Sequence, residues 1–195
     1  MQIEKLKEHF DSYFPLDPAE REALNKLFIE KNLKRKQFIL EQGDVCRHFT
    51  FVVSGCLRLY AVDTQGKEHN LQFIPENDWA TDLNSFYSEQ PSQLFIQALE
   101  PCTVLQIRHD NVLYLYTKYH KFDHNFRVIF EQKYIESQNR ALQNISSSAD
   151  ERYQYFLKQY PNLSNRLSNV QIASYLGITP EFLSMIRKAN VKTKS

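Results

Sequence analysis

The stretch that decides the fold lies near the C-terminus and reads Asn169-Val-Gln-Ile-Ala-Ser-Tyr-Leu-Gly-Ile-Thr-Pro-Glu-Phe-Leu-Ser-Met-Ile-Arg-Lys188. Apolar residues recur at helical spacing on both sides of Gly177, which predicts two short helices that share one small core. Ala173 supplies the small residue needed where the helices approach, and Gly177 tolerates the positive φ that the turn needs. This pattern predicts a helix-turn-helix whose second helix enters the major groove of DNA.

Start signals precede both predicted helices. Ser168 is followed three residues later by Gln171, the pattern of a capping box, and Thr179 precedes Pro180 at the first helical position. From Leu163 to the C-terminus, five basic residues against one acidic residue give a net charge of +4, while the whole chain carries +1. An ordinary helical hairpin with a solvated basic end is the alternative, but caps, turn glycine and charge together favour DNA binding.

The predicted recognition surface is the helix face opposite Leu183 and Ile186. On this face Glu181 can accept a hydrogen bond from cytosine N4, and Thr179 and Ser184 can reach phosphate or base edges. The predicted DNA-binding residues are Thr179, Pro180, Glu181, Ser184, Met185, Arg187 and Lys188.

Composition indicates a folded chain of one large or two modest domains, since 195 residues with 42% hydrophobic and 13% aromatic content can bury a sizeable core. No apolar run approaches bilayer-spanning length and the N-terminus is charged, so we expect a cytoplasmic protein without a membrane segment. Cys46, Cys56 and Cys102 are scattered and odd in number, which predicts reduced thiols rather than a disulfide framework or a metal site.

The N-terminal two thirds change from a helical to a strand period. Amphipathic helices are predicted at Ile3–Phe14 and Asp17–Phe28, the second opened by Asp17-Pro18. Short β-branched or aromatic runs separated by turn residues then predict an antiparallel barrel or jelly roll. The predicted strands lie within 36–44, 48–55, 56–63, 68–74, 94–99 and 102–107.

A long helix is predicted from Asp110 to about Ile145, with a break between Lys118 and Asp123. One stripe of this helix has no obvious partner in the barrel, so we expect it to pack against a second copy of the chain. The alternative is that this face packs back on the barrel. The predicted dimerisation residues are Phe126, Phe130, Tyr134, Ser137, Ala141 and Ile145.

The segment Ser146–Asp150 is the most linker-like in the chain and predicts a domain boundary. The predicted domains are a barrel with N-terminal helices (1–118), a long dimerisation helix with a hinge (119–147) and a helix-turn-helix domain (148–195).

This order of elements resembles the Crp/Fnr superfamily of bacterial transcription regulators over nearly the whole chain. Ile39–Asp44, Phe51–Gly55, Gly66–Glu68 and Asn77–Trp79 look like strand and turn signatures of the cyclic-nucleotide-binding fold. Residues 171–187 are close to the family's pattern Q-I-A-x-x-L-G-I-T-x-E-x-L-S-R-I-R.

The resemblance implies an α+β fold: an antiparallel β jelly roll of cyclic-nucleotide-binding type, a long dimerisation helix and a C-terminal winged helix-turn-helix. It further implies a homodimer that reads a two-fold symmetric site on double-stranded DNA, contacts RNA polymerase and is switched by its barrel.

Cyclic AMP is not the expected effector. The family's phosphate cassette is F-G-E-L, followed about ten residues later by an arginine. Here Thr81 stands at the glycine, Asp82 at the glutamate, and Ser92 or Gln93 at the arginine. Without a cation the buried phosphate is unpaired, at a cost of about 1–3 kcal/mol or more.

The barrel can instead hold another ligand or none. Apolar rings with a few convergent polar groups are typical of a ligand pocket, although a single aromatic in a barrel is more often plain core. The candidate effector-pocket residues are Trp79, Thr81, Asp82, Asn84, Phe86, Ser92, Gln93 and Tyr134.

Neither a metal or other cofactor nor an enzymatic activity is expected. The six histidines show no metal-ligand spacing beyond the weak His120 and His124 pair. An enzyme on a barrel scaffold, such as a cupin, needs clustered histidines and a carboxylate, and His48 and His69 lie far apart. The remaining alternative is a small-molecule-binding signalling module whose C-terminal helices contact protein rather than DNA.

Overall fold

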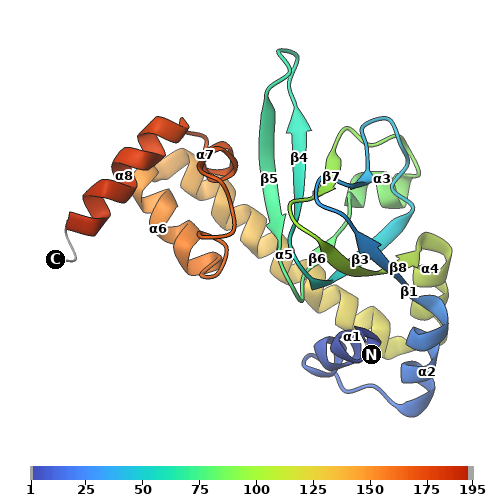
Figure 1. Ribbon diagram of the computed structural model, residues 1–195. Coiled ribbons are helices and arrows are strands. Elements are labelled where there is room, and N and C mark those ends of the chain that lie inside the picture. Colours follow the sequence, from blue (N-terminus) through green and yellow to red (C-terminus); the bar gives the residue numbers. More distant parts are fainter. Residues whose placement is uncertain (1, 193–195) are drawn as a thin grey trace. The chain divides into compact units, whose positions relative to one another are not determined.

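The computed structural model describes residues 2–192, which divide into two compact units. The first unit comprises the chain up to Ala61 and Gln72–Gln132, and the second comprises Val62–Leu71 and the chain from Lys133 onward. The helices, shown in Figure 1, are α1 (Gln2–Asp11), α2 (Pro18–Leu27), α3 (Leu83–Ser88), α4 (His109–Lys118), α5 (His120–Ser146), α6 (Ala149–Gln159), α7 (Asn169–Leu176) and α8 (Pro180–Lys192).

The first unit is built on two four-stranded sheets, with strand orders β1-β8-β3-β6 and β2-β7-β4-β5. Pairs between neighbouring strands are antiparallel, as for β3 on β8, and the apolar faces of the two sheets share one core. The predicted jelly roll is therefore confirmed. The strands are β1 (Ile29–Leu33), β2 (Phe38–Leu40), β3 (His48–Ser54), β4 (Leu57–Val62), β5 (Glu68–Ile74), β6 (Trp79–Ala80), β7 (Phe95–Ala98) and β8 (Cys102–Arg108).

Three elements of this unit escaped prediction. Strand β1 pairs with β8 at the edge of its sheet, and its first four residues are exposed, so it lacks an alternating apolar pattern. Strand β6 has only two residues, and α3 is a helix of six residues capped by Asp82. Elements this short carry too few residues to show a period.

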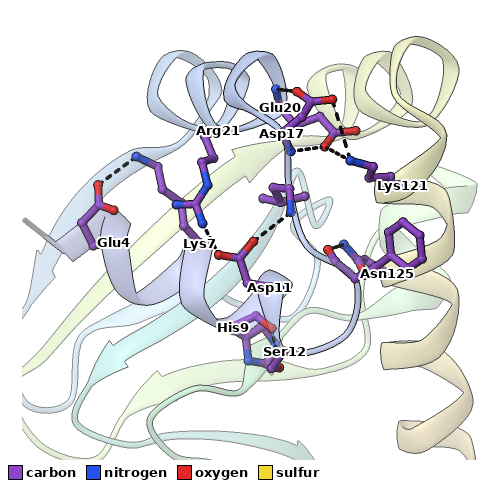
Figure 2. A network of polar contacts seen from close by, with 12 residues as sticks. Glu4, Lys7, His9, Asp11, Ser12, Asp17, Glu20, Arg21, Lys121 and Asn125 are labelled. Carbon is purple, nitrogen blue, oxygen red and sulfur yellow. Dashed lines mark hydrogen bonds and ion pairs between the residues drawn. The ribbon is translucent and has the colours of Figure 1, made fainter.

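Helices α1 and α2 are tied to the first turns of α5 by a polar network (Figure 2). Asp17 caps α2 by accepting from the backbone N–H groups of Ala19 and Glu20. The Glu20 carboxylate in turn accepts from the Asp17 N–H. Lys121 of α5 donates to Glu20 Oε2 at 3.1 Å, and Asn125 Nδ2 donates to a main-chain carbonyl of the α1–α2 loop at 3.3 Å. The predicted Asp17-Pro18 start of α2 is confirmed.

The first half of α5 completes the barrel core, which corrects part of the predicted dimerisation stripe. Phe126 is 1% exposed, and its ring centroid lies 5.5 Å from those of Phe49 and Trp79. Phe130 is partly buried against the same core. Both rings pack against the core of their own chain, because an aromatic cluster of the barrel lies against these turns of α5. The alternative of packing on the barrel is correct for this part of the stripe.

The second unit contains a helix-turn-helix formed by α7 and α8. Ser148 caps α6 in a capping box with Glu151, and Ser168 caps α7 by accepting from Gln171 N at 3.3 Å. Gly177 ends α7 with φ 68° and ψ 35°, the left-handed conformation predicted for it. No strand occurs between 133 and 192, so the predicted wing does not lie in this described segment.

Candidate functional site

The α7–α8 pair is held by a small apolar core. Ile172, Ala173 and Leu176 of α7 and Leu183 and Ile186 of α8 are all buried, with Leu183 fully so. The N–H groups after the helix bond back into its last turn, since Ile178 N donates to Ala173 O at 3.0 Å. The geometry is that of a helix-turn-helix, in which the second helix offers its outer face to the DNA.

The outer face of α8 carries most of the residues predicted to contact DNA. Met185 is 59% exposed, and Glu181 and Lys188 are exposed. Thr179 Oγ1 accepts from Phe182 N at 3.2 Å and so caps α8. Ser184 Oγ donates to the main-chain oxygen of Pro180 at 2.9 Å and accepts from a side-chain amide of α7 at 3.3 Å. Glu181, Met185 and Lys188 are therefore the side chains most available to a ligand.

Arg187 has a different role from the one predicted. Its Nη1 donates to Asn169 Oδ1 at 2.7 Å, and its Nη2 donates to Ser164 O at 3.4 Å. Its guanidinium also lies 5.7 Å from the centroid of the Tyr153 ring. Arg187 thus ties α8 to α7 and to the loop before α7, and it does not belong to the exposed face.

In the barrel, the residues at the positions of the family's phosphate cassette bond to one another. Ser92 Oγ donates to Asp82 Oδ2 at 2.7 Å, and Asp82 Oδ1 accepts from Asn84 N at 3.1 Å at the start of α3. Asp82 is 7% exposed and Ser92 is 3% exposed. Thr81 Oγ1 lies 3.4 Å from Cys46 Sγ. The cassette is thus a buried, internally bonded carboxylate site, which disfavours a phosphate beside it.

The other predicted pocket residues do not converge. Trp79 and Phe86 are 4% and 1% exposed within the hydrophobic core, so they are packing residues, which is the more common role of a single aromatic in a barrel. The side chains of Asn84 and Gln93 are exposed to solvent. Tyr134 is 65% exposed on α5. The predicted pocket is corrected accordingly, because close packing fills the barrel with these rings.

Sequence reasoning missed a buried arginine in the second sheet. Arg58 of β4 is 5% exposed, its Nη2 donates to Gln97 Oε1 of β7 at 2.7 Å, and its guanidinium lies 3.8 Å from the Tyr60 ring centroid. An arginine in a strand gives no local signal of burial, because burial depends on partners from other strands.

The histidine, cysteine and carboxylate side chains of the described residues bear on metal and thiol chemistry. No group of three or more potential metal-ligating side chains occurs among the described residues. The three cysteines are buried, and burial raises the pKa of the Cys102 thiol to about 11, far from a reactive thiolate. Within residues 2–192, no helix has the length and apolar character to cross a membrane.

Comparison with known proteins bears on the fold. Residues 30–119 match the family of the cyclic nucleotide-binding domain. Comparison with curated protein sequences gave no match. Among solved structures, the c-di-GMP responsive global regulator CLP of Xanthomonas campestris is 12% identical, with 91% of this chain and 93% of that chain covered and a TM-score of 0.73.

Two further structures agree with this likeness. FixK2 from Bradyrhizobium japonicum is 17% identical over 86% of each chain, with a TM-score of 0.74. A protein of Eubacterium rectale described as a Crp/Fnr-family transcriptional regulator is 18% identical over 93% of this chain and 88% of that chain, with a TM-score of 0.70. Residues 30–119 are therefore similar to the cyclic nucleotide-binding domain, and the chain has the fold of the Crp/Fnr regulators.

Proposed function

We propose that the protein is a DNA-binding transcription regulator of the Crp/Fnr type and that it acts without catalysing a reaction. The observation that carries this proposal is the exposed outer face of α8, on which Glu181, Met185 and Lys188 stand beside a closed two-helix core. The net charge of +4 from Leu163 onward attracts phosphate to the same segment. The structural relatives described as regulators support the proposal.

The proposed regulator binds DNA as a homodimer, and its two copies contact each other through the second half of α5. Tyr134, Leu142 and Ile145 are 65%, 61% and 86% exposed on this helix, so large apolar side chains face water in a single chain. A row of such residues is typical of a protein interface. Two copies also supply the two recognition helices that a two-fold symmetric DNA site needs.

The proposal excludes cyclic AMP as an effector that binds the barrel. Residues 79–95 contain no lysine or arginine, and Asp82 already bonds to Ser92 and to the start of α3. A cyclic phosphate placed there would meet a buried carboxylate without a neutralising cation. RNA polymerase is the further partner that the proposal implies.

A genome-wide DNA selection with the purified full chain tests the proposed function. We expect enrichment of a two-fold symmetric sequence, and binding that weakens with salt as counterions are displaced from phosphate. The control is the variant with both Glu181 and Lys188 changed to Ala, which should bind DNA more weakly and with relaxed preference at one base pair per half-site while keeping its thermal stability. Enrichment of no sequence by the unmodified chain would contradict the proposal.

A further inference from the structure

The tip of the β4–β5 hairpin, residues 62–71, belongs to the same compact unit as the helix-turn-helix. Its contact with α7 is centred on Asn70, which is 2% exposed. Asn70 Nδ2 donates to Gln171 Oε1 at 2.8 Å and to Gln171 O at 3.0 Å, and Asn70 N donates to Ser174 Oγ at 3.1 Å. Ser174 Oγ in turn donates to Glu68 O at 2.9 Å.

Arg140 of α5 fastens the same contact. Its Nη2 donates to Asn70 O at 2.9 Å and to Tyr175 O at 3.0 Å, and its guanidinium lies 4.0 Å from the centroid of the Tyr175 ring. A planar guanidinium that is stacked and bonded in this way is held in one orientation. We call Asn70, Arg140, Gln171 and Ser174 the clamp, because together they join the hairpin, α5 and α7.

The clamp lies on the side of α7 that faces away from its core. Ile172 and Ala173 are buried against the rest of the unit, while Gln171 and Ser174 are only partly buried. In helix-turn-helix complexes the first helix crosses the DNA backbone, and amide and hydroxyl side chains such as these bond to phosphate. In the free chain both side chains are engaged with the hairpin.

The hairpin also reaches the start of the recognition helix. A groove of about 330 Å³ lies between Lys67 and Glu68 of the hairpin and Ile178 and Pro180 of the turn and α8. Residues 62–71 contain two carboxylates and one lysine, a net charge of −1, whereas the segment from Leu163 onward carries +4. The hairpin is thus a net negative segment in contact with the positively charged helix-turn-helix segment.

We propose that the β4–β5 hairpin is an autoinhibitory latch that covers the DNA-backbone side of α7 and must leave it when DNA binds. This inference rests on the proposed DNA-binding function. Strands β4 and β5 continue from the latch into the sheet β2-β7-β4-β5, so a change in the barrel reaches the latch along the chain itself.

DNA affinity of latch variants tests the proposal on the selected duplex. Asn70→Ala removes the side-chain bonds to Gln171 and should tighten DNA binding by about three- to tenfold, because less free energy is spent on opening the clamp. Gln65→Ala, at the exposed hairpin tip, is the matched control and should bind as the unmodified chain does. Equal or weaker binding by Asn70→Ala would overturn the latch.

A reversible lock tests the same idea in the opposite direction. The Asn70 main-chain N–H donates to Ser174 Oγ at 3.1 Å, so the two residues are in contact, and Asn70→Cys with Ser174→Cys introduces one thiol on each side of that contact. We expect the oxidised double variant to lose at least tenfold in DNA affinity and the reduced form to regain it. An oxidised form that binds DNA as tightly as the reduced form would contradict the latch.

Hydrogen exchange supplies a readout without any substitution. The Asn70 amide is protected by Ser174 Oγ in the free chain, and DNA should speed its exchange by releasing the hairpin. Slower exchange of residues 62–71 on DNA addition would overturn the latch. If the unmodified chain enriches no DNA sequence, the proposed function itself fails, which is distinct from a latch that fails while DNA still binds.

Discussion

At the scale of single residues, Glu181 and Lys188 should contribute to DNA binding in different ways. Both are exposed on α8, but a carboxylate reads a base edge whereas an ammonium meets phosphate. Glu181→Ala should relax preference at one base pair per half-site, and Lys188→Ala should weaken all sequences alike and lower the salt slope by about 0.9 per site. Binding-site selection with each variant checks this. An unchanged preference matrix for Glu181→Ala would contradict direct base readout.

Asp63 at the turn of the hairpin should titrate far below an ordinary aspartate. A hydrogen bond from His69, with further bonds from the N–H groups of Lys67 and Gln65, lowers the pKa of Asp63 to about 2. A carboxyl with a depressed pKa stabilises the fold above its unfolded pKa, and this stabilisation is lost as pH falls from about 4 towards about 2. Carbon-13 titration should show the low value, and His69→Ala should raise it. An ordinary pKa in the unmodified chain would contradict this.

At the scale of elements, the β3–β4 turn depends on a glycine that no other residue replaces. Gly55 has φ 89°, and a Cβ there would lie 2.6 Å from both Cys102 Sγ and Pro101 O. Gly66 also has a positive φ, of 80°, but has open space around it. Gly55→Ala should lower the free energy of unfolding by roughly 3 kcal/mol or more, and Gly66→Ala by about 1 kcal/mol. Urea unfolding checks the difference, and equal losses would contradict the steric argument.

The second half of α5 should hold the dimer together. Leu142→Glu places like charges in the proposed seam and should convert a dimer into monomers in sedimentation experiments. Because Leu142 is 61% exposed in the single chain, its replacement should leave the thermal midpoint of the monomer fold nearly unchanged. Asn144→Glu, about 200° around the helix, is the matched control. A dimer that survives Leu142→Glu would move the interface elsewhere.

At the scale of the whole molecule, the helix-turn-helix was predictable because its signals are local in sequence. The clamp was not predictable because its contacts join residues far apart in sequence. A few neighbouring residues suffice to predict the cap at Ser168, the turn at Gly177 and the core position of Leu183. Asn70 and Gln171 are 101 residues apart, and nothing in the sequence around either one indicates their bond. The same holds for the pairing of Asp82 with Ser92, where comparison with a family motif identified the positions but not the bond.

The barrel as a whole should not bind cyclic nucleotides. Ser92 stands where a phosphate-binding arginine is expected. It donates instead to Asp82, so these two polar side chains bond to each other. Thr81 adds a side chain where backbone should approach phosphate, and this side chain contacts Cys46. Calorimetry with cyclic AMP and cyclic GMP should therefore show no heat of binding.

The converse experiment changes Thr81→Gly, Asp82→Glu and Ser92→Arg together. Each change addresses a different part of the nucleotide, namely the approach of backbone, the ribose hydroxyl and the phosphate charge. The changes at Asp82 and Ser92 are coupled, because these two side chains contact one another, so their effects should not simply add. We expect weak binding of cyclic AMP by the triple variant and none by Thr81→Gly alone, the matched control. Micromolar affinity of the unmodified chain for cyclic AMP would contradict the proposal, because the buried carboxylate of Asp82 would then have to tolerate a phosphate that no cassette cation neutralises.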